Sequence, residues 1–388
     1  MSIGNLSSEG KNKSDKRCVC ISCFNYYETR ISYIRNYFEN KGIETIYITS
    51  NYNHFEKRFF YVDYPNTIQL AVPAYKKNIS ISRIISQLIF SVKTYRSLKK
   101  LSPDIIYCMF PPNSLVALVI RYKKNRLCKV AFDCFDMWPE SLPIHGILKQ
   151  ILSPFLIIWK NLRDNNIEKG NLVLAVSQDM CDSVRKMWPR VPANLLLPGV
   201  SVSNLPTYTY DISNQLSFCY LGNINNITDI DLLVKLLSAV NKHKKVLLHI
   251  IGKGLKLDDL VNNLKSKDIE CRLHGVVMDT SKKREIYSQC NLGLNLPKEE
   301  ILSGMSLKSV EYMAVGLPFI NSGIADNWKI VEDYKVGINV NKRDVQKCVD
   351  TILSLSNEDI QTMSNSCLKY SKNRFETQNL DNILKEVL

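Results

Sequence analysis

The sequence predicts an α/β fold of two consecutive domains, each with a parallel β-sheet covered by helices. Three observations support this prediction. The chain has 388 residues, which is too many for one hydrophobic core. Short apolar runs such as RCVCISC, DIIYCMF and VLLHIIG alternate with longer amphipathic segments, as in sheets that are buried on both faces. A stretch rich in Pro, Gly, Ser and Asn, LLLPGVSVSNLPTYTYDISNQ, interrupts this alternation near the middle of the chain.

This interruption sets the expected domain boundaries. We expect a linker over residues 199–215, a first domain over 18–198 and a second over 216–365. The last residues, 366–388, have the pattern of a helix that could return to the first domain. The first residues, 1–17, are polar and lack the apolar core of a signal peptide, so we expect a disordered tail there.

Both domains are expected to alternate strands with helices. In the first, strands are expected at 17–23, 44–50, 104–110, 129–135 and 171–177. In the second, strands are expected at 216–222, 246–254, 270–277, 292–297, 319–323 and 336–340, with helices at 229–243, 257–267, 282–290 and 307–315. Such folds bind ligands at the carboxyl ends of their parallel strands, so we expect a ligand cleft facing these ends.

Cysteine usage indicates a reducing compartment. The twelve cysteines are scattered, mostly within apolar strand-like runs, which is typical of buried thiols in a cytosolic protein. Cys20 and Cys23 form a C-x-x-C pair, but the pair lies along an expected strand and no second pair accompanies it. We therefore expect neither a metal site nor a redox site there.

The net charge of +14 is concentrated in the first half of the chain. Residues 1–200 hold 28 Lys and Arg against 15 Asp and Glu, whereas residues 201–388 hold 23 against 22. This asymmetry indicates an anionic partner such as a membrane surface, a lipid phosphate or a nucleic acid. No segment has the roughly 18–20 apolar residues that a spanning helix needs.

Two segments of the first half are amphipathic. Residues 83–100 place apolar side chains at 84, 85, 88, 89, 92 and 95 and carry five basic residues and no acidic one. Residues 151–163 are similar but more apolar. Either segment could lie on an anionic membrane surface, and either could equally cover the sheet with a solvated polar face.

The stretch SGMSLKSVEYMAVGLPFI, residues 303–320, combines a glycine loop with a helix that Gly316 and Pro318 end. Free backbone N–H groups at the start of this helix could hold a diphosphate, and Gly304 permits its close approach. Lys308 could contact phosphate, and the Glu311 carboxylate could accept hydrogen bonds from two ribose hydroxyls. An ordinary amphipathic helix with a solvated Glu and Lys is the alternative.

Asp229 and Asp231 form a D-x-D directly before an expected helix. Aspartate is a favoured N-cap residue, so we expect capping rather than metal binding. The histidines show no metal spacing, and His249 and His274 are expected to be packed in or beside strands.

The stretch 303–320 resembles the nucleotide-sugar loop of family 4 GT-B glycosyltransferases, whose pattern is E-G-F-G-L-P-x-x-E-A-M-A-x-G-x-P-V-I. Glu311 matches the second glutamate, which binds ribose in the family, whereas Ser303 replaces the first glutamate. DCFDMWPES, CYLGNINNITDI, HIIGKG and RLHGVV resemble further family passages in the correct order. The family's basic residues in the loop at 222–226 are absent here, and its glycine-rich phosphate loop in the first domain is replaced by CFNYYETR.

The resemblance implies roles for particular residues. The implied donor-binding residues are Ser303, Gly304, Met305, Ser306, Leu307, Lys308, Glu311, Gly222, Asn223, Gly252 and Val276. Asp136, which follows a strand into a loop, is the expected catalytic residue because it could orient or deprotonate an acceptor hydroxyl. Asn25, Tyr27 and Arg30 are the expected acceptor-binding residues, and no metal or cofactor is expected.

The resemblance also implies a GT-B fold with a nucleotide-sugar cleft between two Rossmann-like domains. The implied activity is transfer of a sugar from a nucleotide-diphosphate sugar, with UDP as the expected nucleotide, with retention and without a metal. A polyprenyl-diphosphate-linked glycan in capsule, O-antigen or exopolysaccharide synthesis is the expected acceptor. We expect a cytoplasmic protein that is peripheral at the inner face of the cytoplasmic membrane and contacts its anionic surface.

Two alternatives remain open. The pI of about 9.1 would suit a nucleic-acid-binding protein, although neither aromatic and basic interleaving nor a reading helix is evident, so we expect no nucleic-acid partner. Ser303 and the cation-free loop would suit a GT-B-like protein that has lost catalysis.

Overall fold

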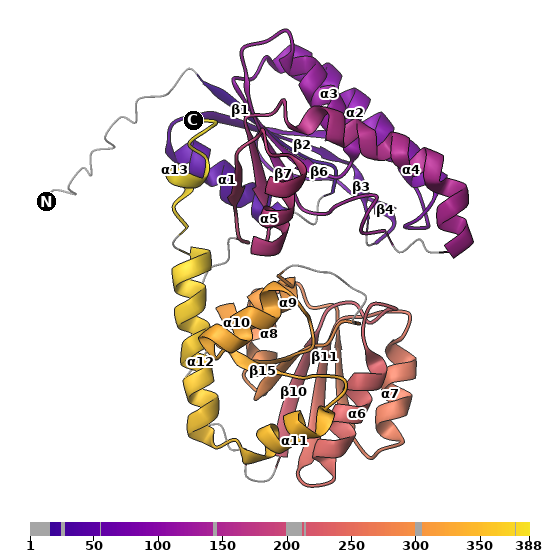
Figure 1. Ribbon diagram of the computed structural model, residues 1–388, viewed down its shortest axis with the longest axis vertical. Helices are drawn as coiled ribbons and strands as arrows, with labels where there is room; N and C mark the ends of the chain where they lie inside the picture. Colours follow the sequence, from indigo (N-terminus) through magenta and orange to yellow (C-terminus); the bar gives the residue numbers. More distant parts are fainter. Residues whose placement is uncertain are drawn as a thin grey trace, which may run out of the picture. The chain divides into compact units, whose positions relative to one another are not determined.

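The computed structural model describes residues 16–24, 28–54, 56–142, 146–198, 212, 215–298, 305–376 and 378–388. The chain divides into two compact units (Figure 1). The first comprises Met1–Val176, Met180–Leu196 and Asn379–Leu388, and the second comprises Ser177–Asp179 and Leu197–Gln378. The predicted tail lies outside the described residues except for its last two, and the predicted linker except for Ile212 and Gln215.

The first unit is built on a seven-stranded parallel sheet in the order β5-β2-β1-β6-β7-β8-β9. Its strands are β1 (Arg17–Ser22), β2 (Glu44–Ser50), β5 (Thr67–Leu70), β6 (Ile105–Phe110), β7 (Lys129–Cys134), β8 (Leu172–Ala175) and β9 (Ala193–Leu195). The helices are α1 (Glu28–Asn40), α2 (Ile81–Leu101), α3 (Asn113–Lys123), α4 (Gly146–Ile167), α5 (Gln178–Met187) and α13 (Leu380–Ile383). Helices α2, α3 and α4 lie side by side in Figure 1.

Burial explains which strands of the first unit could be predicted. Every residue of β6 is buried, as expected of a central strand that is covered on both faces. The edge strands β5 and β9 are short and were not predicted, because β5 is only half-buried and carries little apolar signal. A two-residue antiparallel pair, β3 (Tyr52–Asn53) with β4 (Arg58–Phe59), was also not predicted.

The C-terminal residues return to the first unit. Leu380, Leu384 and Val387 are part of its hydrophobic core. The Tyr37 hydroxyl donates to Asp381 Oδ1 at 2.6 Å, and Asn194 Nδ2 donates to the Ile383 carbonyl at 2.8 Å. The expected single helix over 366–388 is instead divided into the end of α12, a short π-helix and α13, and only residues from 379 onward belong to the first unit.

The second unit has a six-stranded parallel sheet in the order β12-β11-β10-β13-β14-β15. Its strands are β10 (Gln215–Leu221), β11 (Lys245–Ile251), β12 (Glu270–Gly275), β13 (Leu292–Asn295), β14 (Phe319–Asn321) and β15 (Gly337–Asn339). The helices are α6 (Ile230–Asn241), α7 (Leu257–Lys265), α8 (Thr280–Tyr287), α9 (Leu307–Ala314), α10 (Asp326–Tyr334), α11 (Val345–Ser354) and α12 (Asn357–Ser371). Figure 1 shows α6 and α7 on one face of this sheet and α8, α9 and α10 on the other.

A row of asparagines fixes the carboxyl edge of this sheet. Asn295, Asn321 and Asn339 occupy the same register on β13, β14 and β15. Asn295 Nδ2 donates to Asn321 Oδ1 at 2.9 Å, and Asn321 Nδ2 donates to Asn339 Oδ1 at 2.8 Å. These bonds satisfy amides that would be costly to bury alone, and they hold together the sheet edge beside which α9 begins.

Candidate active site

The N-terminus of α9 presents backbone N–H groups at the carboxyl edge of the second sheet. Ser306 is the N-cap residue, but its side chain makes no capping hydrogen bond. The first helical bond runs from the Val310 amide to the Ser306 carbonyl at 3.1 Å. Among the residues that the structure describes, the amides of residues 307–309 therefore have no acceptor. Together with the helix dipole they favour an anionic group at this position.

Lys308 extends from the first turn of α9 toward the end of β10. Its Nζ donates to the Tyr220 hydroxyl at 2.8 Å and lies 4.2 Å from the centroid of the Tyr220 ring. A Cβ built on Gly222 would be 3.4 Å from Lys308 Cε. The loop that follows β10 has no basic residue of its own, so Lys308 supplies a positive charge beside it.

Two side chains of α8 hold Glu311. Lys283 Nζ and the Tyr287 hydroxyl donate to the same carboxylate oxygen, Oε1, at 2.5 and 2.7 Å. Within the described part of the chain, Oε2 makes no hydrogen bond. Burial and the Glu311 carboxylate raise the pKa of Tyr287 far above its usual range, so its hydroxyl remains a donor. The carboxylate is therefore oriented on one side and has one oxygen for another donor.

A glycine without a side chain follows each of the strands β10 and β11. Gly222 and Gly252 have φ angles of 112° and 152°. A Cβ at Gly252 would lie 1.9 Å from the Gly222 carbonyl oxygen, so no larger residue fits there without a shift of the backbone. This close approach places the loop containing Asn223, whose side chain is exposed, against the turn after β11.

The other predicted donor residues surround this edge only in part. Leu307 and Val276 are about half exposed, and Val276 directly follows β12. Met305 and Ser306 are partly exposed at the start of α9. Ser303 and Gly304 lie outside the described residues. The described donor candidates thus all belong to the second unit. They lie at the ends of β10, β11 and β12 and at the start of α9.

The histidines beside Val276 are packed, as predicted. His249 is fully buried, and its ring stacks on His274 with the centroids 5.3 Å apart and an angle of 12° between the planes. Burial, and then the neighbouring His274, lower the pKa of His249 to about 4. His249 is therefore neutral near pH 7 and adds no charge to this edge.

The first aspartate of the D-x-D caps a helix. Asp229 Oδ1 accepts the Leu232 amide at 3.0 Å, and Asp229 Oδ2 lies 2.7 Å from Lys342 Nζ. Over the described ranges, no group of three His, Cys, Asp or Glu side chains could hold a metal ion. All twelve cysteines, including Cys20 and Cys23, are unpaired thiols.

Sequence reasoning missed Lys283, Tyr287 and Tyr220. Lys283 and Tyr287 are one helical turn apart on α8, and both contact a carboxylate 24–28 positions later in the chain. Local patterns carry no signal for such a contact. An i, i+4 spacing on α8 is the only hint that they share a face.

In the first unit, Asp136 organises its own loop. Its Oδ1 accepts the Met137 amide at 2.8 Å and the Ser141 hydroxyl, and its Oδ2 accepts the Trp138 indole N–H at 2.7 Å. Both carboxylate oxygens are therefore occupied within the loop. These bonds favour a structural role for Asp136, and its catalytic role stays a prediction.

Arg30 is buried beneath the sheet edge. Its Nε and Nη2 donate to the two oxygens of Asp133 at 2.6 and 2.9 Å, and the Tyr107 hydroxyl donates to Asp133 as well. Asp133 is fully buried and Arg30 is 4% exposed. This internal pair favours a structural role for Arg30 over direct contact with an acceptor. Asn25 and Tyr27, the other predicted acceptor residues, lie outside the described residues.

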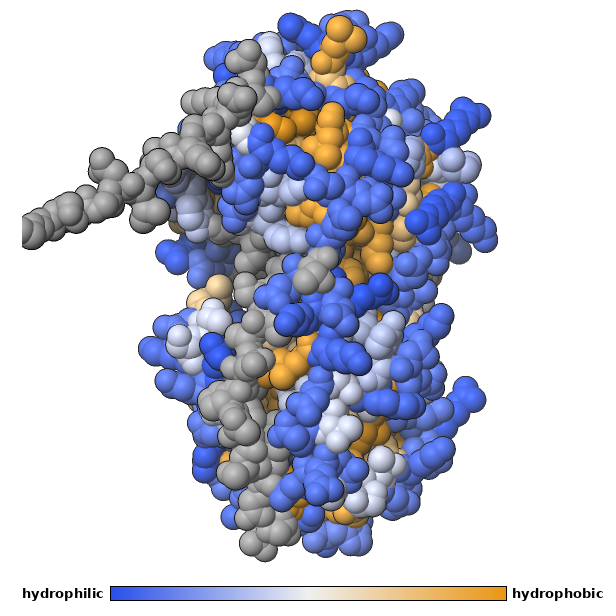
Figure 2. All heavy atoms as spheres, turned by 90° about the vertical axis from the view of Figure 1, so that its left-hand side faces the viewer, coloured by the Kyte–Doolittle hydropathy of each residue, from blue (hydrophilic) through white to orange (hydrophobic). Residues whose placement is uncertain are grey.

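Helices α2 and α4 expose apolar side chains. Ile81, Ile85 and Leu88 are exposed along one stripe of α2, whereas its buried face includes Arg83, Ser86, Gln87, Ser91 and Thr94. Helix α4 exposes Ile147, Ile151, Phe155, Ile157 and Ile158. The face in Figure 2, which is turned away from the outer end of α4, is mostly hydrophilic with scattered apolar patches. Of the apolar side chains of α2, Ile84 and Tyr95 pack against the core of the first unit, whereas Ile81, Ile85 and Leu88 are exposed.

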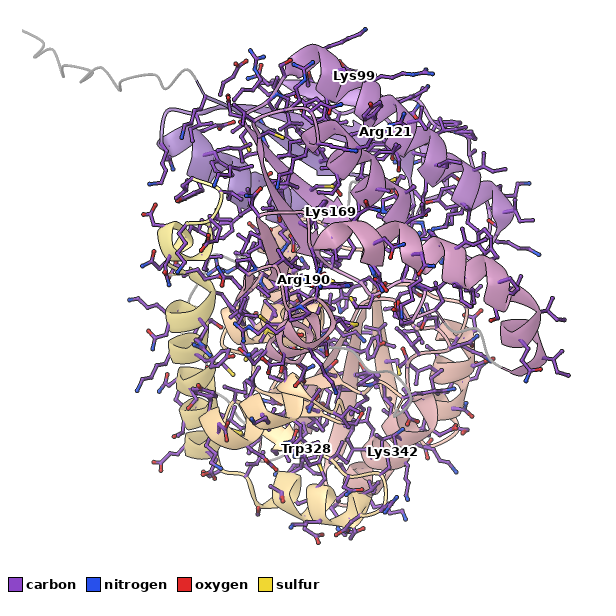
Figure 3. The ribbon with its side chains drawn as sticks, turned by 45° about the horizontal axis from the view of Figure 1, so that its top comes forward. Lys99, Arg121, Lys169, Arg190, Trp328 and Lys342 are labelled. Carbon is purple, nitrogen blue, oxygen red and sulfur yellow. The ribbon has the colours of Figure 1, made fainter. Side chains whose placement is uncertain are left out.

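Basic side chains accompany these helices. Arg96, Lys99 and Lys100 are exposed on α2. Figure 3 shows Lys99 on α2 and Arg121 on the neighbouring α3, and both cations lie over the Tyr95 ring, at 4.6 and 5.9 Å from its centroid. Arg163 of α4, by contrast, is fully buried and pairs with Glu140 at 2.6 Å. No described helix is both long and apolar enough to cross a membrane.

Comparison with known proteins agrees with this architecture. Residues 215–358 match the family model of Glycosyl transferases group 1. This range contains the described donor candidates of the second unit. No curated protein matches the chain.

Three solved structures illustrate the similarity in fold. Sucrose-phosphate synthase from Thermosynechococcus elongatus is 12% identical, with 93% of this chain and 95% of that chain covered and a TM-score of 0.68. HepE from Anabaena in complex with UDP is 13% identical over 96% and 98%, with a TM-score of 0.66. The lipopolysaccharide outer core galactosyltransferase WaaB is 16% identical over 96% and 100%, with a TM-score of 0.65.

The chain therefore has the GT-B fold that its sequence predicted. The domain match and the fold together support a glycosyltransferase.

Proposed function

We propose that the chain transfers a sugar from a UDP-sugar to a polyprenyl-diphosphate-linked glycan. The observation that carries this proposal is the combination of unpartnered α9 amides, Lys308 and Glu311 within the second unit. HepE, a structural neighbour, is described in complexes with UDP and with UDP-glucose, which supports UDP as the nucleotide.

Each group has a role in this proposal. The α9 amides and Lys308 bind the diphosphate and stabilise the charge that develops on it as the sugar leaves. Glu311 accepts hydrogen bonds from the ribose through Oε2, while Lys283 and Tyr287 hold Oε1. The nucleotide base lies beside Val276, near the ends of β10 and β11, where Gly222 and Gly252 have no side chains. Retention of configuration and independence from metal follow from the family resemblance and remain predictions.

The surface of the first unit supports a lipid-linked acceptor. Exposed apolar side chains on α2 and α4, accompanied by exposed basic residues, are typical of helices that lie in a membrane interface. We propose that these helices dock the enzyme on the inner face of the cytoplasmic membrane. The glycan would then belong to capsule, O-antigen or exopolysaccharide synthesis.

A panel of nucleotide sugars tests this proposal. UDP-sugars, GDP-mannose and dTDP-glucose are compared for their effect on the melting temperature, because a ligand that binds only the folded state stabilises it. We expect UDP and at least one UDP-sugar to raise the melting temperature. The best donor is then supplied with membrane lipids, and transfer of labelled sugar to lipid is measured.

The outcomes separate the alternatives. Stabilisation by duplex DNA and by no nucleotide sugar would favour the nucleic-acid-binding alternative. Binding of UDP-sugar without transfer to any lipid-linked or free acceptor would favour a GT-B-like protein without catalysis.

A further inference from the structure

Tyr312 of α9 reaches into the sheet of the second unit at the point where the strand order reverses. The order β12-β11-β10-β13-β14-β15 places β10, the first of these strands in the chain, beside β13, and later strands lie on both sides of this pair. The ladder between β10 and β13 ends with Tyr220 opposite Leu294. Open parallel sheets bind ligands outside the carboxyl ends of their strands at such a reversal.

The Tyr312 hydroxyl bonds the backbone around this last residue pair. It accepts the Leu221 amide at 2.8 Å, donates to the Cys219 carbonyl at 3.1 Å and lies 3.5 Å from the Leu294 carbonyl oxygen. Tyr312 is fully buried. Burial, and then the neighbouring Cys219, raise its pKa well above the usual range, so the hydroxyl stays protonated and serves as donor and acceptor at once. The end of β10 is therefore fastened to α9 as well as to β13.

Gly293 of β13 makes room for the Tyr312 ring. A Cβ built on Gly293 would lie 2.7 Å from Cδ2 of this ring, closer than real Cβ atoms approach. The ring also meets the Tyr287 ring edge to face, with the centroids 6.1 Å apart and an angle of 84° between the planes. Tyr312 stands where the pattern of the family 4 glycosyltransferases has alanine, so that pattern does not account for this arrangement.

Tyr312 and Lys308 lie one helical turn apart on α9 and fasten the same strand end. Lys308 Nζ donates to the Tyr220 hydroxyl at 2.8 Å, while Tyr312 bonds the backbone on both sides of Tyr220. Gly222 follows Leu221 directly, and a Cβ built on Gly222 would lie 3.4 Å from Lys308 Cε. How Lys308 lies against the Gly222 backbone therefore depends on the bonds that Tyr312 makes to β10.

We propose that Tyr312 is a positioning residue of the donor site. By bonding the backbone of Cys219 and Leu221, it sets how Lys308 lies against the Gly222 backbone, and thereby where the diphosphate of the donor binds. Tyr312 acts through these groups and does not touch the donor, because it is fully buried. The role rests on the proposed function, whereas the bonds of Tyr312 do not.

The test compares UDP and UMP binding by the full chain, measured by calorimetry. Tyr312→Phe removes the hydroxyl and keeps the ring. We expect this variant to bind UDP about three- to tenfold more weakly than the wild type does, since a neutral hydrogen bond contributes that much. Its affinity for UMP should fall less, because UMP lacks the terminal phosphate that Lys308 meets.

A variant elsewhere in the core separates positioning from general stability. Ile352→Val shortens a fully buried side chain of α11, so it should lower the melting temperature and leave UDP affinity unchanged. Tyr312→Phe should bind UDP more weakly even well below its melting temperature. Unchanged UDP affinity of folded Tyr312→Phe, or equal losses for UMP and UDP, would overturn the positioning role.

Hydrogen exchange without any nucleotide tests the bonds of Tyr312 independently of the donor. The Leu221 amide should exchange faster in Tyr312→Phe because it loses an acceptor, whereas the Val340 amide, which donates to the Asn321 carbonyl at 2.8 Å, should be unchanged. Unchanged exchange at Leu221 would overturn the positioning role even if UDP binds. Faster exchange at Leu221 with no UDP binding by the wild type would instead refute the donor site, and with it the role of Tyr312 there, while the bonds themselves stand.

Discussion

Lys283 Nζ lies 2.5 Å from Glu311 Oε1 and joins α8 to α9 in the second unit. Both side chains are partly exposed, at 19% and 32%, so the pair lies at the surface of the unit rather than in its core. Tyr287, one turn later on α8, donates to the same oxygen. Glu311 is therefore held from α8, and its orientation depends on two residues outside the stretch 303–320.

The first prediction concerns these two residues. Tyr287→Phe and Lys283→Met should each weaken UDP binding several-fold, because each removes one of the bonds that orient Glu311, and a hydrogen bond typically contributes about 0.5–1.5 kcal/mol. Isothermal calorimetry measures the effect. Lys283→Arg should restore part of the affinity, and Lys282→Met, at the exposed neighbouring lysine, should have none. Equal affinities for all four variants would show that Glu311 needs no support from α8.

Arg30 and Asp133 form a buried pair whose removal should affect folding. Arg30→Met should lower the free energy of unfolding by about 3–5 kcal/mol, because it leaves the Asp133 carboxylate buried without its partner. Arg58→Met, which breaks an exposed pair with Glu56, should cost less than about 1 kcal/mol. Urea unfolding measures both. A stable Arg30→Met protein with weakened acceptor binding would instead support the predicted acceptor role.

Much of the fold could be predicted from the sequence because the central strands are continuous apolar runs. The two edge strands, β5 and β9, were missed because they are only four and three residues long and mostly half-buried, which gives no clear pattern. The orientation of α2 could not be predicted from periodicity either. Its buried face carries Arg83 and Ser91 as well as Phe90 and Leu98. Ser91 bonds Ser114 of α3 and Arg83 packs on aromatic rings, and no local pattern reveals these contacts.

The candidate site could be predicted only where a motif marks it. Glu311 and Lys308 lie within such a motif, and the structure places both on α9. Other elements of the second unit supply Lys283, Tyr287 and Tyr220, and only folding brings these side chains into contact with Glu311 and Lys308. For Asp136 and Arg30, the sequence indicated polar groups near strand ends but not their partners, which the structure identifies as Trp138 and Asp133.

The exposed stripes of α2 and α4 predict binding to anionic membranes. The chain should sediment with phosphatidylglycerol vesicles more than with phosphatidylcholine vesicles, and less at high salt, since each basic group near the surface contributes on the order of 1 kcal/mol and salt screens it.

Two sets of substitutions test the surface. Replacing Lys93, Arg96, Lys99 and Lys100 with Gln together should remove the preference for anionic lipid, and replacing Ile147, Ile151 and Ile158 with Ser should weaken binding to both lipids. Leu127→Ser, at a fully exposed leucine on another part of the first unit, is the control. Vesicle binding that changes neither with lipid charge nor with either set of substitutions would contradict membrane docking.

Catalysis is predicted to need no divalent metal. Asp229, the first carboxylate of the D-x-D, caps α6 and pairs with Lys342, and the α9 amides with Lys308 offer positive charge to the diphosphate. Transfer of labelled sugar should therefore proceed unchanged in excess EDTA. Loss of turnover in EDTA that manganese restores would show that a metal is required.

The central claim is that Glu311 and the start of α9 bind the nucleotide of the donor, and calorimetric titration of UDP tests it most directly. Glu311→Gln should fold as the wild type does but bind UDP about 10- to 100-fold more weakly, because a charged hydrogen bond to the ribose contributes roughly 1.5–3 kcal/mol. Glu285→Gln, at an exposed glutamate of α8, should bind UDP as the wild type does. Equal UDP affinity in wild type and Glu311→Gln, or no UDP binding by the wild type, would contradict the claim.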